Sequence, residues 1–113
     1  MPRAATAERL DRTFHALADA SRRAMIDQLA SGPASVSELA RPLALGLPSV
    51  VKHLQVLKAA GLVQSEKSGR VHTYRMSADA LRGVEAWVQA RKRHLHAQFD
   101  RLDQLLAQGE ETA

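Results

Sequence analysis

The sequence predicts a mainly helical α+β domain with four short helices, a two-stranded hairpin and a long final helix. Three observations predict this fold. Apolar residues recur every three or four positions, glycine and proline interrupt that pattern at short intervals, and one segment favours strands instead. The chain has 113 residues, of which 45% are hydrophobic, a fraction typical of a folded protein rather than a disordered one. We therefore expect a single domain over residues 1–113.

The apolar periodicity marks five helices, each bounded by residues that cap or end helices. Asp19 and Ser37 can accept hydrogen bonds from the first free N–H groups of the second and third helices. Pro42 has no N–H and therefore stands only at the end of the third helix, and Gly61 suits the end of the fourth. Ser77 is expected to cap the fifth. The predicted helices span about residues 6–17, 20–30, 37–41, 47–60 and 78–108.

Between the fourth and fifth helices the sequence favours a β-hairpin. Segments 62–67 and 70–76 flank a Ser-Gly dipeptide that is typical of a tight turn, and the second segment contains β-branched and aromatic residues. Lys67 and Arg70 lie beside the turn. The predicted hairpin therefore has a basic tip.

Two short helices joined by a tight turn and followed by a basic hairpin make a winged helix-turn-helix. We place the helix-turn-helix at about 36–60, the wing at about 62–76 and a C-terminal helix at about 78–108. The second helix of such a motif enters the major groove, and the wing meets the neighbouring backbone. For His53 a place in helix packing is the alternative to DNA contact. The candidate DNA contacts are Ser37, Ser49, Lys52, His53, Gln55, Lys67, Arg70, His72 and Arg75.

The charge distribution favours a nucleic-acid partner. The chain has 16 Lys and Arg against 12 Asp and Glu, a net charge of +4. Residues 33–76 contain six basic and two acidic residues, so the predicted motif alone carries a charge as large as that total. A local cationic surface attracts polyanions and releases their counterions. Double-stranded DNA is therefore the expected partner.

Several segments resemble the ArsR/SmtB family of bacterial repressors, over about residues 8–90. Gly69-Arg70 and Tyr74-Arg75 are similar to the wing of that family. The resemblance implies a homodimer of α-α-α-α-β-β-α subunits that binds operator DNA and represses transcription. The other matching segments are ALADASRR at 16–23, SELA at 37–40 and LPSVVKHLQVLKAAGLV at 47–63.

A homodimer also follows from the last predicted helix, because 31 amphipathic residues carry more apolar surface than so small a domain can cover. The resemblance implies that the first and last helices join the two subunits. Trp87 and Phe99 could instead line an effector pocket, although an apolar stripe is more often a dimer core. The candidate interface residues are Leu10, Phe14, Trp87, Leu95, Phe99, Leu102 and Leu106.

The sequence departs from the family pattern in two ways. Val51 stands where the family usually has serine, which keeps open a winged-helix protein-interaction module without DNA binding. The chain has no cysteine, so the cysteine pair of the family's metal sensors is absent and we expect no metal and no cofactor. His94 and His96 point about 200° apart on a helix. His96 with Asp100 is better spaced, and leaves a metal- or small-molecule-responsive repressor with His and Asp ligands as an alternative.

Other functional classes are excluded by motifs that the sequence lacks. It contains no HExxH, no glycine-rich phosphate loop and no Ser-His-Asp arrangement in a suitable context, so we do not expect an enzyme. No run approaches the roughly 18 apolar residues of a membrane span. Residues 1–11 lack the apolar core of a signal peptide, so we expect a cytoplasmic protein with no membrane partner. No motif identifies an effector.

Overall fold

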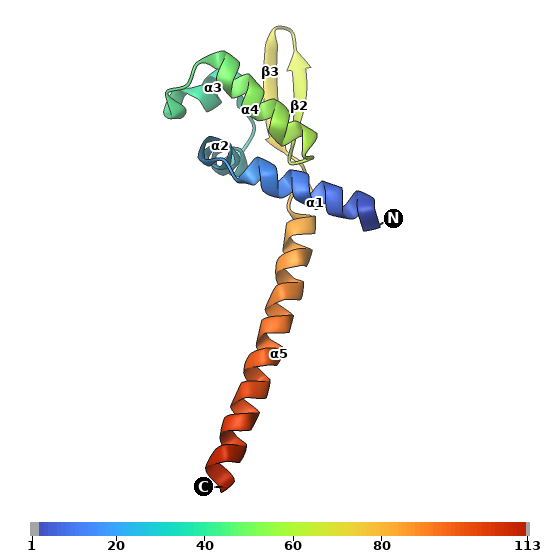
Figure 1. Cartoon of the computed structure of the whole chain (residues 1–113). Helices are drawn as coiled ribbons and strands as arrows, with labels where there is room; N and C mark the ends of the chain where they lie inside the picture. Colours follow the sequence, from blue (N-terminus) through green and yellow to red (C-terminus); the bar gives the residue numbers. More distant parts are fainter. Residues whose placement is uncertain (1–2, 113) are drawn as a thin grey trace. The chain divides into compact units, whose positions relative to one another are not determined.

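A computed structural model describes residues 3–112 of the chain, with side chains described for residues 7–109. The chain divides into two compact units, residues 1–81 and residues 82–113 (Figure 1). The winged helix-turn-helix fold predicted above is confirmed, while the single domain over 1–113 stays a prediction. The elements in chain order are α1 (Arg3–Leu17), α2 (Ala20–Ser31), β1 (Ala34–Ser35), α3 (Val36–Ala40), the 3-10 turn η1 (Arg41–Leu43), α4 (Leu47–Ala59), β2 (Val63–Ser68), β3 (Val71–Met76) and α5 (Arg82–Thr112).

The sheet of the first unit is antiparallel, with its strands in the order β1-β3-β2. The hairpin strands β2 and β3 are paired along their whole length, out to Ser68 opposite Val71. Strand β1 adds a short third strand, with Ala34 opposite Tyr74. The sequence analysis missed β1 because two residues are too few to show a strand period.

Helix α3 is capped by Ser35, whereas the sequence analysis expected Ser37. The Ser35 hydroxyl accepts a hydrogen bond from the Glu38 N–H at 3.2 Å, and the Glu38 carboxylate accepts one from the Ser35 N–H at 3.1 Å. This reciprocal pair is a capping box. Hydrogen bonding of the Glu38 carboxylate to the Ser35 backbone N–H, and then to the Ser35 side chain, holds the pKa of Glu38 below its usual range. The prediction was two residues late because Ser37 has the same capping chemistry.

Replacing Ser35 is therefore expected to destabilise the protein, and replacing Ser37 is not. Ser35→Ala removes the N-cap acceptor and should lower the free energy of unfolding by about 1 kcal/mol. Ser37→Ala, on an exposed side chain, should change it by less than about 0.5 kcal/mol. Urea unfolding of the two variants beside the wild type measures both values. Equal losses in the two variants would contradict the cap assignment.

The start of the last helix also differs from its prediction. Helix α5 begins at Arg82, and residues 78–81 form turns. The Ser77 carbonyl accepts a hydrogen bond from the Ala80 N–H at 3.2 Å within this turn. Ser77 therefore closes the turn that precedes the helix instead of capping the helix at residue 78. Among the residues that the structure describes, none of the helices combines the length and the hydropathy of a membrane-spanning segment.

The core of the first unit is built from the four helices α1 to α4, the short strand β1 and the base of the hairpin. Helix α4 contributes the buried Val50, Leu54 and Leu57, which recur at helical spacing and turn the opposite side of the helix outward. Gly61 follows this helix with φ +77°, a left-handed conformation that ends the helix and starts the turn into β2. The largest fully buried side chains are Met25, Leu39, Leu54, Leu57, Leu62, Val50 and Val63.

Candidate nucleic-acid interface

The outward side of α4 is polar and accessible. Ser49, Lys52 and Gln55 are all exposed, on the sides of the helix that the core does not cover. Ser37, in the first turn of α3, is exposed as well. Pro48 stands in the first turn of α4, where its missing N–H costs no helical hydrogen bond. The second helix of the motif therefore has one face buried in the core and one face exposed to solvent, as a groove-binding helix requires.

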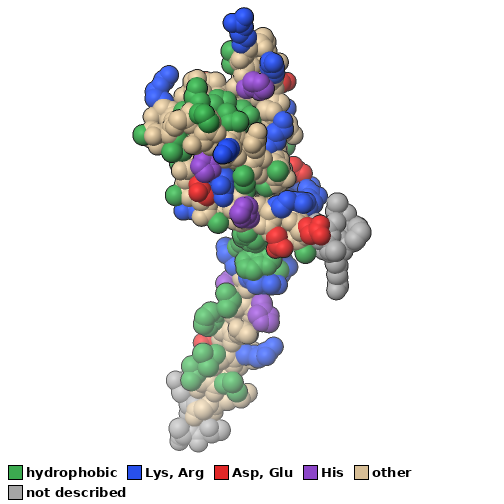
Figure 2. Space-filling model, turned by 45° about the horizontal axis from the view of Figure 1, so that its top comes forward, with side chains coloured by type: hydrophobic (Ala, Val, Ile, Leu, Met, Phe, Trp, Pro, Cys, Tyr) green, Lys and Arg blue, Asp and Glu red, His purple; other side chains and the backbone are tan. Residues whose placement is uncertain are grey.

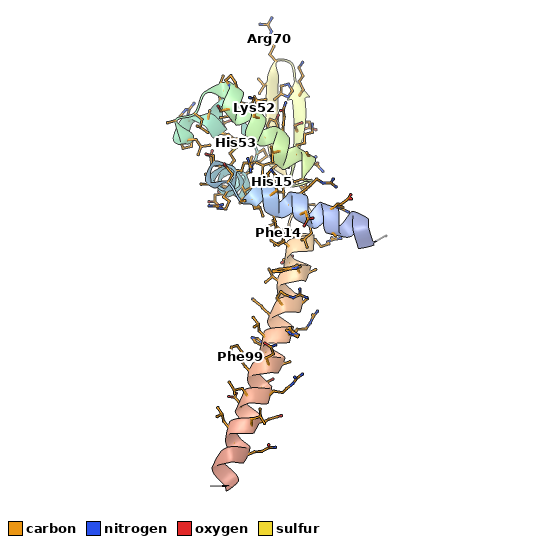
Figure 3. The ribbon with its side chains drawn as sticks, in the orientation of Figure 1. Phe14, His15, Lys52, His53, Arg70 and Phe99 are labelled. Atoms are coloured by element: carbon orange, nitrogen blue, oxygen red, sulfur yellow. The ribbon has the colours of Figure 1, made fainter. Side chains whose placement is uncertain are left out.

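The wing, which we define as β2, β3 and the turn between them, extends the exposed basic surface. Gly69 has φ +62° and forms the tight turn at its tip. Lys67, Arg70 and His72 are exposed around that turn. Figure 2 shows Lys and Arg side chains at the hairpin end of the molecule, and Figure 3 shows Arg70 extending from the tip. These side chains are free to meet a phosphate backbone.

Two further basic residues are braced at the base of the wing. Arg75 donates from Nη2 to Oε1 of Gln64 at 2.9 Å, across the paired strands. Lys58 donates from Nζ to Oγ of Ser65 at 2.8 Å, and so ties α4 to β2. The sequence analysis predicted Arg75 as a contact but missed Lys58, because its link to Ser65 becomes visible only once α4 and β2 are packed together. Both side chains remain exposed.

His53 points toward α2 rather than outward from α4. Its Nδ1 lies 3.2 Å from Nη1 of Arg22 and 3.9 Å from Oδ1 of Asp19, and 22% of its side chain is exposed. A guanidinium can only donate, so Nδ1 of His53 is the acceptor in this hydrogen bond. This contact fits the packing alternative that the sequence left open, and contact of the partly exposed His53 with DNA stays a prediction.

Arg22 connects three helices through one guanidinium. Its Nε donates to the Ala16 carbonyl at 2.7 Å and its Nη2 to the His15 carbonyl at 3.1 Å, both in the last turn of α1. Carbonyls in that turn lack partners within the helix. Its Nη1 bonds His53 of α4, and Figure 3 shows His15 and His53 on these two helices. The sequence analysis missed this residue because nothing in the periodicity distinguishes Arg22 from Arg23.

Asp19 completes the attachment of α2. Its carboxylate accepts a hydrogen bond from the Arg22 N–H at 3.0 Å as the N-cap of that helix, as the sequence predicted. This bond, followed by the charge of Arg22, holds the pKa of Asp19 below its usual range. The side chain of Arg22 and the cap of α2 thus fix the same junction between helices.

The geometry agrees with what comparison to known proteins finds. Residues 17–66 match a family model described as a helix-turn-helix domain. The crystal structure of an ArsR family transcriptional regulator, RHA00566, is 40% identical to this chain, covers 79% of it and 92% of that chain, and has a TM-score of 0.75. The chain belongs to the ArsR family. This family consists of DNA-binding transcriptional regulators and is not enzymatic. The prediction that the chain is not an enzyme is therefore confirmed.

Two other relatives add detail. The homodimeric winged helix-turn-helix DNA-binding domain of Mb0332 from Mycobacterium bovis is 30% identical, covers 82% of this chain and 88% of that one, and has a TM-score of 0.66. The regulator Rv2034 of Mycobacterium tuberculosis is 45% identical over 71 residues. That match spans 63% of this chain and 66% of Rv2034. The similarity to Rv2034 therefore covers about two thirds of its length.

The expected dimer residues of this ArsR-family regulator lie on apolar surfaces of α1 and α5. In α1, Leu10 is half-buried and Phe14 is exposed. In α5 every predicted residue is exposed, as is Leu105, which was not predicted. Figure 2 shows hydrophobic side chains along one side of α5. Those that share one stripe, which we call the α5 stripe, are Val84, Val88, Leu95, Phe99, Leu102 and Leu106.

Trp87 lies beside the α5 stripe and not on it. Helical geometry turns it about 120° away from Phe99. The guanidinium carbon of Arg91 stands 5.3 Å from the centroid of its ring, within the range of a cation–π contact. Trp87 is therefore at the edge of the apolar surface that was expected to form the dimer core.

The histidines of α5 do not assemble a metal site within one chain. Nε2 of His94 accepts a hydrogen bond from Nε2 of Gln98 at 3.3 Å. Among residues whose side chains are described, no three His, Asp or Glu groups gather to hold an ion. The hypothesis of His96 and Asp100 as metal ligands therefore requires further ligands from a second chain.

Proposed function

We propose that this ArsR-family regulator is a homodimeric repressor that binds an inverted-repeat operator in double-stranded DNA. The observation that carries the proposal is the division of α4 into a face buried by Val50, Leu54 and Leu57 and a face that exposes Lys52 and Gln55. We propose that the whole chain acts as one functional domain, in the branch of the family without cysteine metal sites, and that it acts in the cytoplasm.

Dimerisation would be provided by the α5 stripe together with Leu10 and Phe14 of α1. These apolar side chains are exposed or half-buried in a single chain, and covering them with a second copy removes them from water. The homodimeric Mb0332 domain supports this assembly. Two α4 helices related by a two-fold axis enter successive major grooves about one helical turn apart, so the operator is an imperfect inverted repeat.

The proposed DNA contacts fall into two groups, those in the major groove and those of the wing with the phosphate backbone. Lys52, Gln55 and Ser49 are proposed to reach base edges and phosphates in the major groove. Lys67 and Arg70 of the wing are proposed to contact phosphates of the neighbouring backbone, with His72, Arg75 and Ser37 on the flanks. Repression then follows from occupancy, because a dimer bound at a promoter excludes the polymerase from the same DNA.

Selection of bound duplexes by the purified full-length protein tests this function. Fragments recovered from a random pool, with excess competitor DNA present, should contain an inverted repeat whose half-sites are centred about 10 base pairs apart. A gel shift with the selected duplex and with a scrambled duplex of equal composition confirms specificity. A protein that enriches no sequence would refute the proposal and favour the protein-interaction module that Val51 left open.

Lys52→Ala is expected to weaken DNA binding through the loss of one positive charge in each subunit. If Lys52 contacts phosphate, the variant should bind all duplexes more weakly, and the slope of log affinity against log salt should fall by about two for the dimer. If Lys52 contacts guanine, preference for one base pair in each half-site should disappear instead. Fluorescence anisotropy at several salt concentrations measures both effects. Unchanged affinity and an unchanged slope would remove Lys52 from the interface.

A further inference from the structure

One apolar side chain stands within the polar surface proposed to meet DNA. Leu47 is the first residue of α4, directly after the N-cap Gly46, and 50% of it is exposed. Pro48 beside it is exposed and Val51, one turn later, is half-buried. Figure 2 shows hydrophobic side chains at the surface of this part of the molecule, with Lys, Arg and His side chains around them. Packing in the core of the helix-turn-helix does not explain why a leucine stands at this exposed position.

Helical geometry places Leu47 on the DNA-facing end of the motif. The N-terminal residues of a groove-binding helix are those that contact base edges. At 100° per residue, Leu47 and Val51 lie about 40° apart and form one apolar edge of the exposed face. Gln55 lies about 40° beyond Val51 on the outward side of the helix, and Lys52 lies about 100° beyond Val51. A major groove that receives the N-terminal end of α4 therefore brings base pairs against Leu47, whichever groups Lys52 contacts further along the helix.

The chemistry of the major groove restricts what Leu47 can contact there. A leucine cannot form hydrogen bonds, so covering the donor or acceptor of a base with it costs free energy without compensation. The one apolar group on the major-groove edges of the four base pairs is the C5-methyl group of thymine. Contact with that methyl group removes apolar surface of both partners from water.

We infer that Leu47 is a specificity-determining residue that contacts the methyl group of a thymine in each half-site, with Val51 as the adjoining apolar surface. The inference rests on the proposed function and extends it, because it assigns one base of the operator to one residue. Neither the charged nor the amide side chains of α4 can make this distinction through an apolar contact. A T·A pair is thereby preferred at the position that faces residue 47.

Replacement of single thymines by deoxyuridine in the selected operator tests the inference. Uracil lacks only the C5-methyl group, so it keeps the hydrogen-bonding groups of thymine. Wild-type affinity should fall about four-fold for one half-site, the change expected for one buried methyl group, at one thymine position facing α4. Substitution in both half-sites should lower it about 15-fold. Anisotropy titrations of each duplex measure these ratios.

Two variants complete the test. Leu47→Ala removes the apolar contact from an exposed site that tolerates alanine, and should bind the thymine and uracil duplexes equally at that position. Leu47→Met keeps an apolar side chain and should retain the uracil sensitivity. Thermal melting of both variants should match the wild type.

The outcomes separate this inference from the proposed function. A selected operator in which no uracil substitution lowers wild-type affinity overturns the role of Leu47 while DNA binding stands. The same holds if Leu47→Ala keeps the uracil sensitivity of the wild type. Failure to select any operator overturns the proposed function and the inference together.

Discussion

Phe99→Asp is expected to convert the protein into monomers and to lower its affinity for the inverted repeat by about 100-fold or more. Phe99 lies on the α5 stripe between Leu95 and Leu102, and 60% of it is exposed in a single chain. In a dimer that buries this stripe, an aspartate would be an unpaired charge in an apolar interface, which costs several kcal/mol. Because a dimer makes its second half-site contact intramolecular, losing the partner forfeits an avidity of about 10²–10⁴.

The α5 helix itself offers a matched control. Gln104 is exposed and lies about 140° around the helix from Phe99, away from the α5 stripe. Gln104→Asp introduces the same charge and should leave both the dimer and the operator affinity close to those of the wild type. Sedimentation equilibrium and a gel shift with the selected operator measure the two properties. A Phe99→Asp protein that sediments as an intact dimer would show that α5 joins the subunits elsewhere or not at all.

The sequence was sufficient where a feature depends on local periodicity. The inner face of α4 follows from Val50, Leu54 and Leu57 at helical spacing, and the exposed tip of the wing follows from a turn dipeptide between two basic residues. These patterns are set within a few neighbouring positions. The order of helices and the hairpin were therefore predicted, and the structure confirms them.

Features that depend on contacts between residues far apart in the sequence could not be predicted from local patterns. The orientation of His53 is set by Arg22, 31 positions earlier in the chain, and no spacing rule shows that pair. Two serines of equal capping chemistry compete at the start of α3, and the pairing of β1 with β3 accompanies the cap at Ser35. The exposed Leu47 was also missed, because the candidate contacts were chosen among polar residues.

Arg22→Ala is expected to lower both the stability of the protein and its affinity for the operator. The substitution removes three side-chain hydrogen bonds, to the His15 and Ala16 carbonyls and to Nδ1 of His53. At about 1 kcal/mol for a typical bond, partly compensated by water, we expect a loss of about 2 kcal/mol in the free energy of unfolding. Without the link from α1 to His53, α4 is less firmly positioned, and operator affinity should fall about ten-fold at temperatures where the variant is fully folded.

Substitution of Arg23 tests whether Arg22 positions α4 or only caps the end of α1. Its Nη1 donates to the Leu17 carbonyl at 2.8 Å, so it also stabilises the end of α1, but the bond to His53 belongs to Arg22. Arg23→Ala should therefore lower stability by about 1 kcal/mol and leave operator affinity unchanged. His53→Ala should lower operator affinity as much as Arg22→Ala does, and should lower the free energy of unfolding by less. If Arg22→Ala and Arg23→Ala bind the operator equally well once folded, Arg22 only caps α1, and the position of α4 is set by its buried apolar face alone.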